Sequence, residues 1–224
     1  MTEIVTLADA QHLPRWRRPI VLLFLMALAM PIAFNTWAAL LNNFVIEAAQ
    51  FDGADIGLLH TVREIPGFLA IGVIAIIIFV REQVLGLVSL ILLGVATAVT
   101  AYFPTLGGIL TLTMLSSIGF HYYETVNQSL QLQWLPKADA PRILGWLMAM
   151  GSAATFVVYL IILSLWEPLG LTYNTVYMFG GLVTVFLAIF AMVALLVANL
   201  FILRAVMTKE LDVHLIQLFS RKIV

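Results

Sequence analysis

Polar side chains recur along one apolar stretch, Leu106 to Trp134, which is long enough to cross a bilayer as a helix. On a helix turning about 100° per residue they share one stripe roughly 80° wide. The stripe consists of Thr113, Ser117, His121, Glu124, Gln128 and Gln131. A charged side chain at mid-membrane costs about 2.5–3.5 kcal/mol on insertion scales. A polar face kept at that cost is expected to line water, a substrate or a protein partner rather than lipid.

Two ionisable members of the stripe, His121 and Glu124, are three residues apart and therefore adjacent on the helix surface. Histidine titrates near neutral pH, and a carboxylate withdrawn from water favours its protonated form. The pair is a candidate for coupling proton movement to transport. The alternative is a structural hydrogen-bond cluster that fixes helix packing.

A second polar group, His60, Arg63 and Glu64, lies within about 100° on one face of the stretch Asp55–Phe79. Arg63 keeps its charge at any relevant pH and therefore needs an anion. Glu64, Glu124, or a carboxylate or phosphate of an anionic substrate could supply it. A fixed ion pair and a substrate site both remain open.

A metal site is the third reading of these side chains. His60 with Glu64 and His121 with Glu124 could offer two nitrogens and two oxygens to a divalent ion. No single segment forms a metal motif, however, and Arg63 would repel a cation. The chain has no cysteine, which excludes disulfides and thiol chemistry. We therefore expect no metal and no cofactor.

The composition indicates an integral membrane protein, because 62% of the residues are hydrophobic, 10% are charged and the mean hydropathy is +1.06. The apolar stretches predict an all-α fold of six transmembrane helices. These are Pro19–Asn42, Asp55–Phe79, Gln83–Phe103, Leu106–Trp134, Arg142–Leu165 and Tyr173–Leu203.

Basic residues orient the chain, because lysine and arginine near span ends are retained in the cytoplasm. With the N-terminus inside, every basic residue except Arg63 lies in a cytoplasmic segment, and the outer loops carry only acids. Both termini are therefore expected in the cytoplasm. Residues 1–18 would be a cytoplasmic segment, 19–203 the six-helix domain, and 204–224 a cytoplasmic tail or the start of a loop between two halves. We expect the inner (plasma) membrane of a bacterium.

Polar residues are divided among the spans with a period of three. The first span carries Asn35 and Asn42 on one face and the fourth carries the stripe, whereas the third and sixth carry almost nothing ionisable between their ends. An inverted three-plus-three repeat would produce this division. Over residues 19–203 the chain therefore resembles the N-terminal six-helix half of a major facilitator superfamily transporter.

The motifs of that family are only partly present. Its signature between the second and third spans begins with glycine, then an acid and an arginine, whereas residues 80–86 here read Val-Arg-Glu-Gln-Val-Leu-Gly and lose the acid-first order. Gly145 and Gly151 loosely resemble its glycine-rich antiporter motif, without the proline. Members normally have about twelve spans with the substrate between the halves. The resemblance thus implies a second six-helix half, or another copy of the chain, as partner.

The predicted function is transport of a small solute by alternating access, with proton coupling as a further hypothesis. The expected pathway residues are Asn35, His60, Arg63, Glu64, Ser117, His121, Glu124 and Gln128. The alternative is a non-transporting membrane scaffold or assembly subunit whose polar stripe is buried against a partner. An intramembrane protease would need a histidine in the last span, which is absent, so we expect no enzyme. The net charge of −1 gives no indication of nucleic-acid binding.

Overall fold

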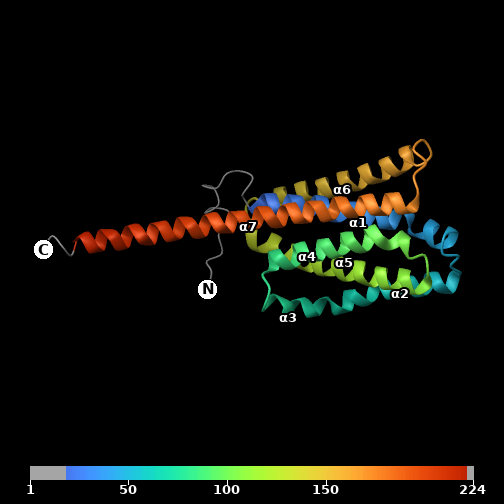
Figure 1. The fold of residues 1–224 in the computed structure, drawn as a ribbon, viewed down its shortest axis with the longest axis horizontal. Helices are drawn as coiled ribbons and strands as arrows, with labels where there is room; N and C mark the ends of the chain where they lie inside the picture. Colours follow the sequence, from blue (N-terminus) through green and yellow to red (C-terminus); the bar gives the residue numbers. More distant parts are fainter. Residues whose placement is uncertain (1–18, 221–224) are drawn as a thin grey trace.

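The computed structural model describes residues 19–220, and all regular elements in this range are helical (Figure 1). The predicted cytoplasmic segment 1–18 and residues 221–224 lie outside the described part. The elements are α1 (Pro19–Glu47), α2 (Gly53–Leu69), η3 (Ala70–Gly72), α3 (Val73–Ile77), α4 (Glu82–Val99), η4 (Thr100–Tyr102), α5 (Leu106–Trp134), α6 (Ala140–Leu165) and α7 (Tyr173–Ser220).

Five helical segments of the described chain are long and apolar enough to cross a membrane, which indicates an integral membrane protein. They are Ile20–Glu47, Gly53–Ile77, Glu82–Tyr102, Ala140–Leu165 and Tyr173–Val197. Helix α5 has the predicted bounds and the length for a crossing but is not among the five. Its polar stripe lowers its hydropathy. Five candidate spans are thus found where the sequence predicts six.

The second predicted span is one rod made of three pieces. Asp52 caps α2 by accepting hydrogen bonds from the backbone of Ala54 and Asp55, and the Asp55 side chain closes a capping box. Pro66 lies inside α2 and cannot donate a backbone hydrogen bond there. The rod tightens into η3 one turn later and resumes as α3. Such a change of helix type after a proline typically bends a membrane helix.

The rods run alternately in opposite directions (Figure 1). One end of the bundle holds the links α1–α2, η4–α5 and α6–α7. Helix α1 begins at the other end, and α7 extends out of the bundle there. Helix α4 packs between α5 and α7, α1 packs against α6 and α7, and α2 packs against α5. Helices α1, α2, α4 and α5 together surround the region where four of the predicted pathway residues meet.

Helix α4 is held against its neighbours by close backbone contacts and by a polar link. A side chain at Gly94 or Gly181 would collide with the opposing backbone of α7 or α4. Small residues of this kind let membrane helices approach closely. At the start of α4, the Glu82 carboxylate accepts hydrogen bonds from Ser129 at 3.1 Å and Gln133 at 2.8 Å, both on α5. Helix α4 is therefore firmly packed against α5 and α7.

Helix α7 extends beyond the predicted boundary at Leu203. It continues as one helix to Ser220 and projects past the ends of the other helices (Figure 1). The segment predicted as a tail or inter-half loop is therefore helical up to Ser220 and continuous with the last span. A polar composition alone does not stop a helix when no proline or glycine interrupts it, and residues 182–220 contain neither.

Candidate functional site

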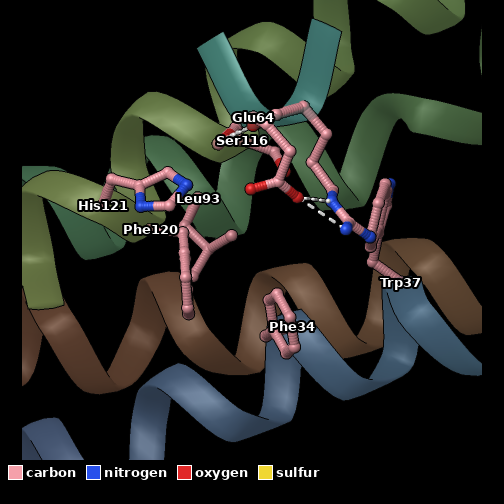
Figure 2. A pocket seen from close by; sticks show the side chains of 9 residues that line it. Phe34, Trp37, Glu64, Leu93, Ser116, Phe120 and His121 are labelled. Carbon is pink, nitrogen blue, oxygen red and sulfur yellow. Dashed lines mark hydrogen bonds and ion pairs between the residues drawn. The ribbon is translucent and has the colours of Figure 1, made fainter. Parts of the chain in front are cut away.

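A cavity of about 220 Å³ lies between four helices of the bundle (Figure 2). Helices α1 and α2 each supply two wall residues, α4 supplies one and α5 supplies four. The lining residues are Phe34, Trp37, Arg63, Glu64, Leu93, Ser116, Ser117, Phe120 and His121. Four of the eight predicted pathway residues are among them, namely Arg63, Glu64, Ser117 and His121. These charged and polar groups lie near the middle of α2 and α5.

The charged wall of the cavity is an ion pair between neighbours on α2. Arg63 Nη2 lies 2.6 Å from Glu64 Oε1, and Arg63 Nε donates to the same oxygen at 2.9 Å (Figure 2). The side chains are 36% and 55% exposed. Of the anions that the sequence offered to Arg63, the structure selects Glu64, so Glu124 is not its partner. Both donors meet one carboxylate oxygen, and the other oxygen accepts no hydrogen bond from the described residues.

The α5 wall is positioned by contacts with α2. The Ser117 hydroxyl donates to the backbone carbonyl of Arg63, which ties the two helices together at the site. The imidazole of His121 lies against the α2 backbone, because a Cβ added at Gly67 would come within 3.2 Å of its Cε1. Ser116 is buried and lines the cavity, but none of the hydrogen bonds among the described residues involves its hydroxyl. Gly67 thus makes room for His121.

The remaining wall is aromatic. The rings of Phe34 and Phe120 stack with centroids 4.7 Å apart, and Trp37 lies 6.3 Å from Phe34 in a tilted arrangement (Figure 2). Trp37 is only 3% exposed, and its buried indole N–H has no hydrogen-bond partner among the described residues. Such rings offer apolar surface to a solute and a favourable π-face to a cation.

The other predicted pathway residues do not line this cavity. Asn35 is bonded to α6, because its amide donates to Thr155 at 2.9 Å and its carbonyl accepts from Tyr159 at 3.0 Å. His60 and Glu124 are half-buried, and Gln128 is exposed. The structure therefore gives Asn35 a role in packing α1 against α6. Of the polar stripe on α5, Ser117 and His121 therefore lie at the cavity, whereas Glu124 and Gln128 lie beyond it.

Sequence reasoning missed five of the lining residues: Phe34, Trp37, Leu93, Ser116 and Phe120. Ser116 and Phe120 directly precede predicted residues on α5, which was the only local signal for them. Phe34, Trp37 and Leu93 lie in apolar spans, where one more apolar or aromatic residue does not stand out. Only the packing of α1 and α4 against α5 reveals them.

Among the described residues, no group of three or more His, Cys, Asp or Glu side chains could hold a metal ion. The lining of the cavity offers an ion pair, one imidazole and two hydroxyls enclosed by aromatic rings. Comparisons of the chain with family models, curated proteins and solved structures gave no match.

Proposed function

We propose that the chain carries a small polar solute across a membrane by alternating access. It would act as a carrier rather than as an enzyme, in the manner of the N-terminal half of a major facilitator superfamily transporter. The observation that supports this most is the cavity at mid-length of α2 and α5, walled by Arg63, Glu64 and His121. Charged groups at that depth are costly in lipid and usually mark a substrate or ion pathway. Solute sites of such carriers lie near the bilayer midplane.

The packing of the helices supports an inverted repeat. Such a repeat would pair α1 with α5, α2 with α6, and α4 with α7. Under this pairing the α1–α6 contact corresponds to the α5–α2 contact, and the α1–α7 contact corresponds to the α5–α4 contact. All four contacts occur. The α4–α7 contact maps onto itself, and the α1–α4 packing is the exception. This pairing counts α5 as a membrane crossing in addition to the five candidate spans. A sixth crossing would be tolerated if the polar stripe of α5 faces the pathway instead of lipid.

Proton coupling through His121 and Glu124 is part of the proposal. His121 lines the cavity, while Glu124 lies one turn further along α5. A solute entering from one side would meet His121, and a proton passing along the stripe would meet Glu124. The pathway would be completed by a second six-helix half or another copy of the chain, in a bacterial inner membrane with both termini in the cytoplasm.

A membrane scaffold is the second candidate, and one observation favours it. The Asn35 amide and the Arg63 guanidinium both find partners within the chain, as they would in a static packing core. In that case the polar stripe of α5 would bury against a partner subunit and stay dry.

Water access to His121 separates the two functions. In the cysteine-free chain, a cysteine at His121 should react with a small methanethiosulfonate reagent in liposomes, because the cavity would be hydrated. A cysteine at Val126, on the same helix and only 1% exposed, is the matched control and should stay inert. Equal inertness at both positions would favour the scaffold.

Orientation is tested at Gln50, which is exposed in the link between α1 and α2. A cysteine there should react with an impermeant maleimide added outside intact cells, because the basic residues retain the opposite end of the bundle in the cytoplasm. Labelling only after the cells are opened would reverse the proposed topology.

A further inference from the structure

We propose that the cavity binds a zwitterionic solute with an apolar body, the chemistry of an α-amino acid with an aliphatic side chain. This substrate class deepens the transport function proposed above and rests on it. From the sequence, Arg63 is open to a fixed ion pair or to an anionic substrate. The structure does not favour an anionic substrate, because Arg63 and Glu64 are both in the wall.

The charge of the wall is balanced. A solute carrying only a carboxylate would gain the attraction of Arg63 but meet the repulsion of Glu64 at the same wall. A solute carrying only an ammonium group would face the reverse. A zwitterion places each of its charges beside the opposite charge of the wall, so it alone interacts favourably with both.

Both members of the ion pair keep bonding capacity for such a solute. An arginine side chain has five N–H donors. Glu64 accepts hydrogen bonds from only two of the five on Arg63, one on Nε and one on Nη2. The second carboxylate oxygen of Glu64, which accepts no hydrogen bond from the described residues, is available to an ammonium group. Ser116 on α5 adds a hydroxyl to the lining of the same cavity. These groups can therefore hold a carboxylate and an ammonium without breaking the ion pair.

The other walls fit a small apolar body. Phe34, Phe120 and Leu93 provide the apolar surface opposite the charged groups, and the aromatic faces also favour a nearby ammonium group (Figure 2). About 220 Å³ corresponds to roughly seven water molecules at ~30 Å³ each. That space suits a solute of the size of leucine.

The test is calorimetric titration of the purified full chain in nanodiscs with three matched probes. They are L-leucine, 4-methylpentanoate, which is leucine without its ammonium group, and 3-methylbutylamine, which is leucine without its carboxylate. Leucine should bind at least about tenfold more tightly than either, because each lost charge-assisted contact weakens binding by about that factor. Equal binding of 4-methylpentanoate would make the cavity an anion site and overturn the proposal, as would no binding of leucine.

Two charge-neutralising variants sharpen the test. Glu64→Gln should shift the preference toward 4-methylpentanoate, and Arg63→Gln should shift it toward 3-methylbutylamine. Glu167→Gln and Arg142→Gln remove the same charges at exposed positions away from the cavity and should leave the preferences unchanged. Unchanged preferences in the two cavity variants would also overturn the assignment. The three-probe comparison on the unmodified chain decides the matter if a variant does not fold.

Failure of this inference is distinguishable from failure of the transport function. If a cysteine at His121 is reachable from water but leucine does not bind, the pathway stands and the substrate class is wrong. If leucine binds but the cysteine is unreachable on both sides of the membrane, the cavity is a binding site without a pathway.

Discussion

Replacing Gly119 by leucine should prevent the helical bundle from forming. Gly119 lies where α5 crosses α4, and a Cβ there would come within 2.7 Å of both the Ser89 carbonyl oxygen and the Leu93 backbone nitrogen. Both atoms belong to helical backbone, which cannot rotate away as a side chain can. The two helices would have to separate. Size-exclusion chromatography in mild detergent should show aggregate instead of a single folded species.

The milder change Gly119→Ala should fold but lose stability. Overpacking a tight contact costs about 1–3 kcal/mol, and about 1 kcal/mol lowers the Tm of a chain of this size by roughly 2–4 °C. Gly107 is the matched control, because it is on the same helix and a Cβ added there would meet no atom within 4 Å. Gly107→Ala should leave the Tm unchanged or slightly raised. An equal response at both positions would contradict the close α4–α5 contact.

The same contact positions the site. Gly119 lies between Ser117 and His121 on α5, so displacement of the helix would move both residues away from Arg63 and Gly67 on α2. Water accessibility of a cysteine at His121 should therefore change in Gly119→Ala and not in Gly107→Ala.

The helices could be predicted from the sequence because each depends on local properties. The bounds of α5 agree with prediction at both ends, since Pro104 and Thr105 precede it and Pro136 follows. That α7 runs unbroken from the last span to Ser220 was not predicted, because hydropathy marks where a helix leaves lipid and not where it stops. The piece η3 was also missed, since Pro66 indicates a bend without fixing its form.

The site could be predicted only in part for a related reason. Ionisable residues in an apolar span are conspicuous, so Arg63, Glu64, Ser117 and His121 were identified from the sequence. Their grouping depends on the angle at which α2 crosses α5, which periodicity within one helix cannot give. Asn35 was conspicuous in the same way, yet its amide is satisfied by Thr155 and Tyr159 of α6. A polar residue in a span thus marks a contact, and only packing shows whether a solute or a helix makes it.

Neutralising Glu124 and neutralising Glu64 should have different effects on the Tm. Glu124→Gln should keep the Tm within about 2 °C, less than ~1 kcal/mol, because Arg63 already has Glu64 as its partner. Glutamine also approximates the protonated carboxyl group, so insertion should be normal. Glu64→Gln should lower the Tm moderately, since it leaves Arg63 unpaired, and the partial exposure of both side chains limits the loss. Adding Arg63→Gln to Glu64→Gln should restore part of it.

The functional effect of Glu124→Gln should be confined to proton coupling. If Glu124 alternates between its charged and protonated forms, Glu124→Gln should abolish proton-driven uptake of radiolabelled leucine into proteoliposomes, while exchange of leucine across the membrane without a gradient should persist. Exchange would need the proposed binding site at Arg63 and Glu64 but no net proton movement, so the two assays separate binding from coupling. The Tm of each single and double variant should be measured alongside the uptake and exchange assays. A large loss of Tm in Glu124→Gln that Arg63→Gln repairs would make Glu124 a fixed partner of Arg63. That result would contradict both the ion pair in the structure and the protonation role.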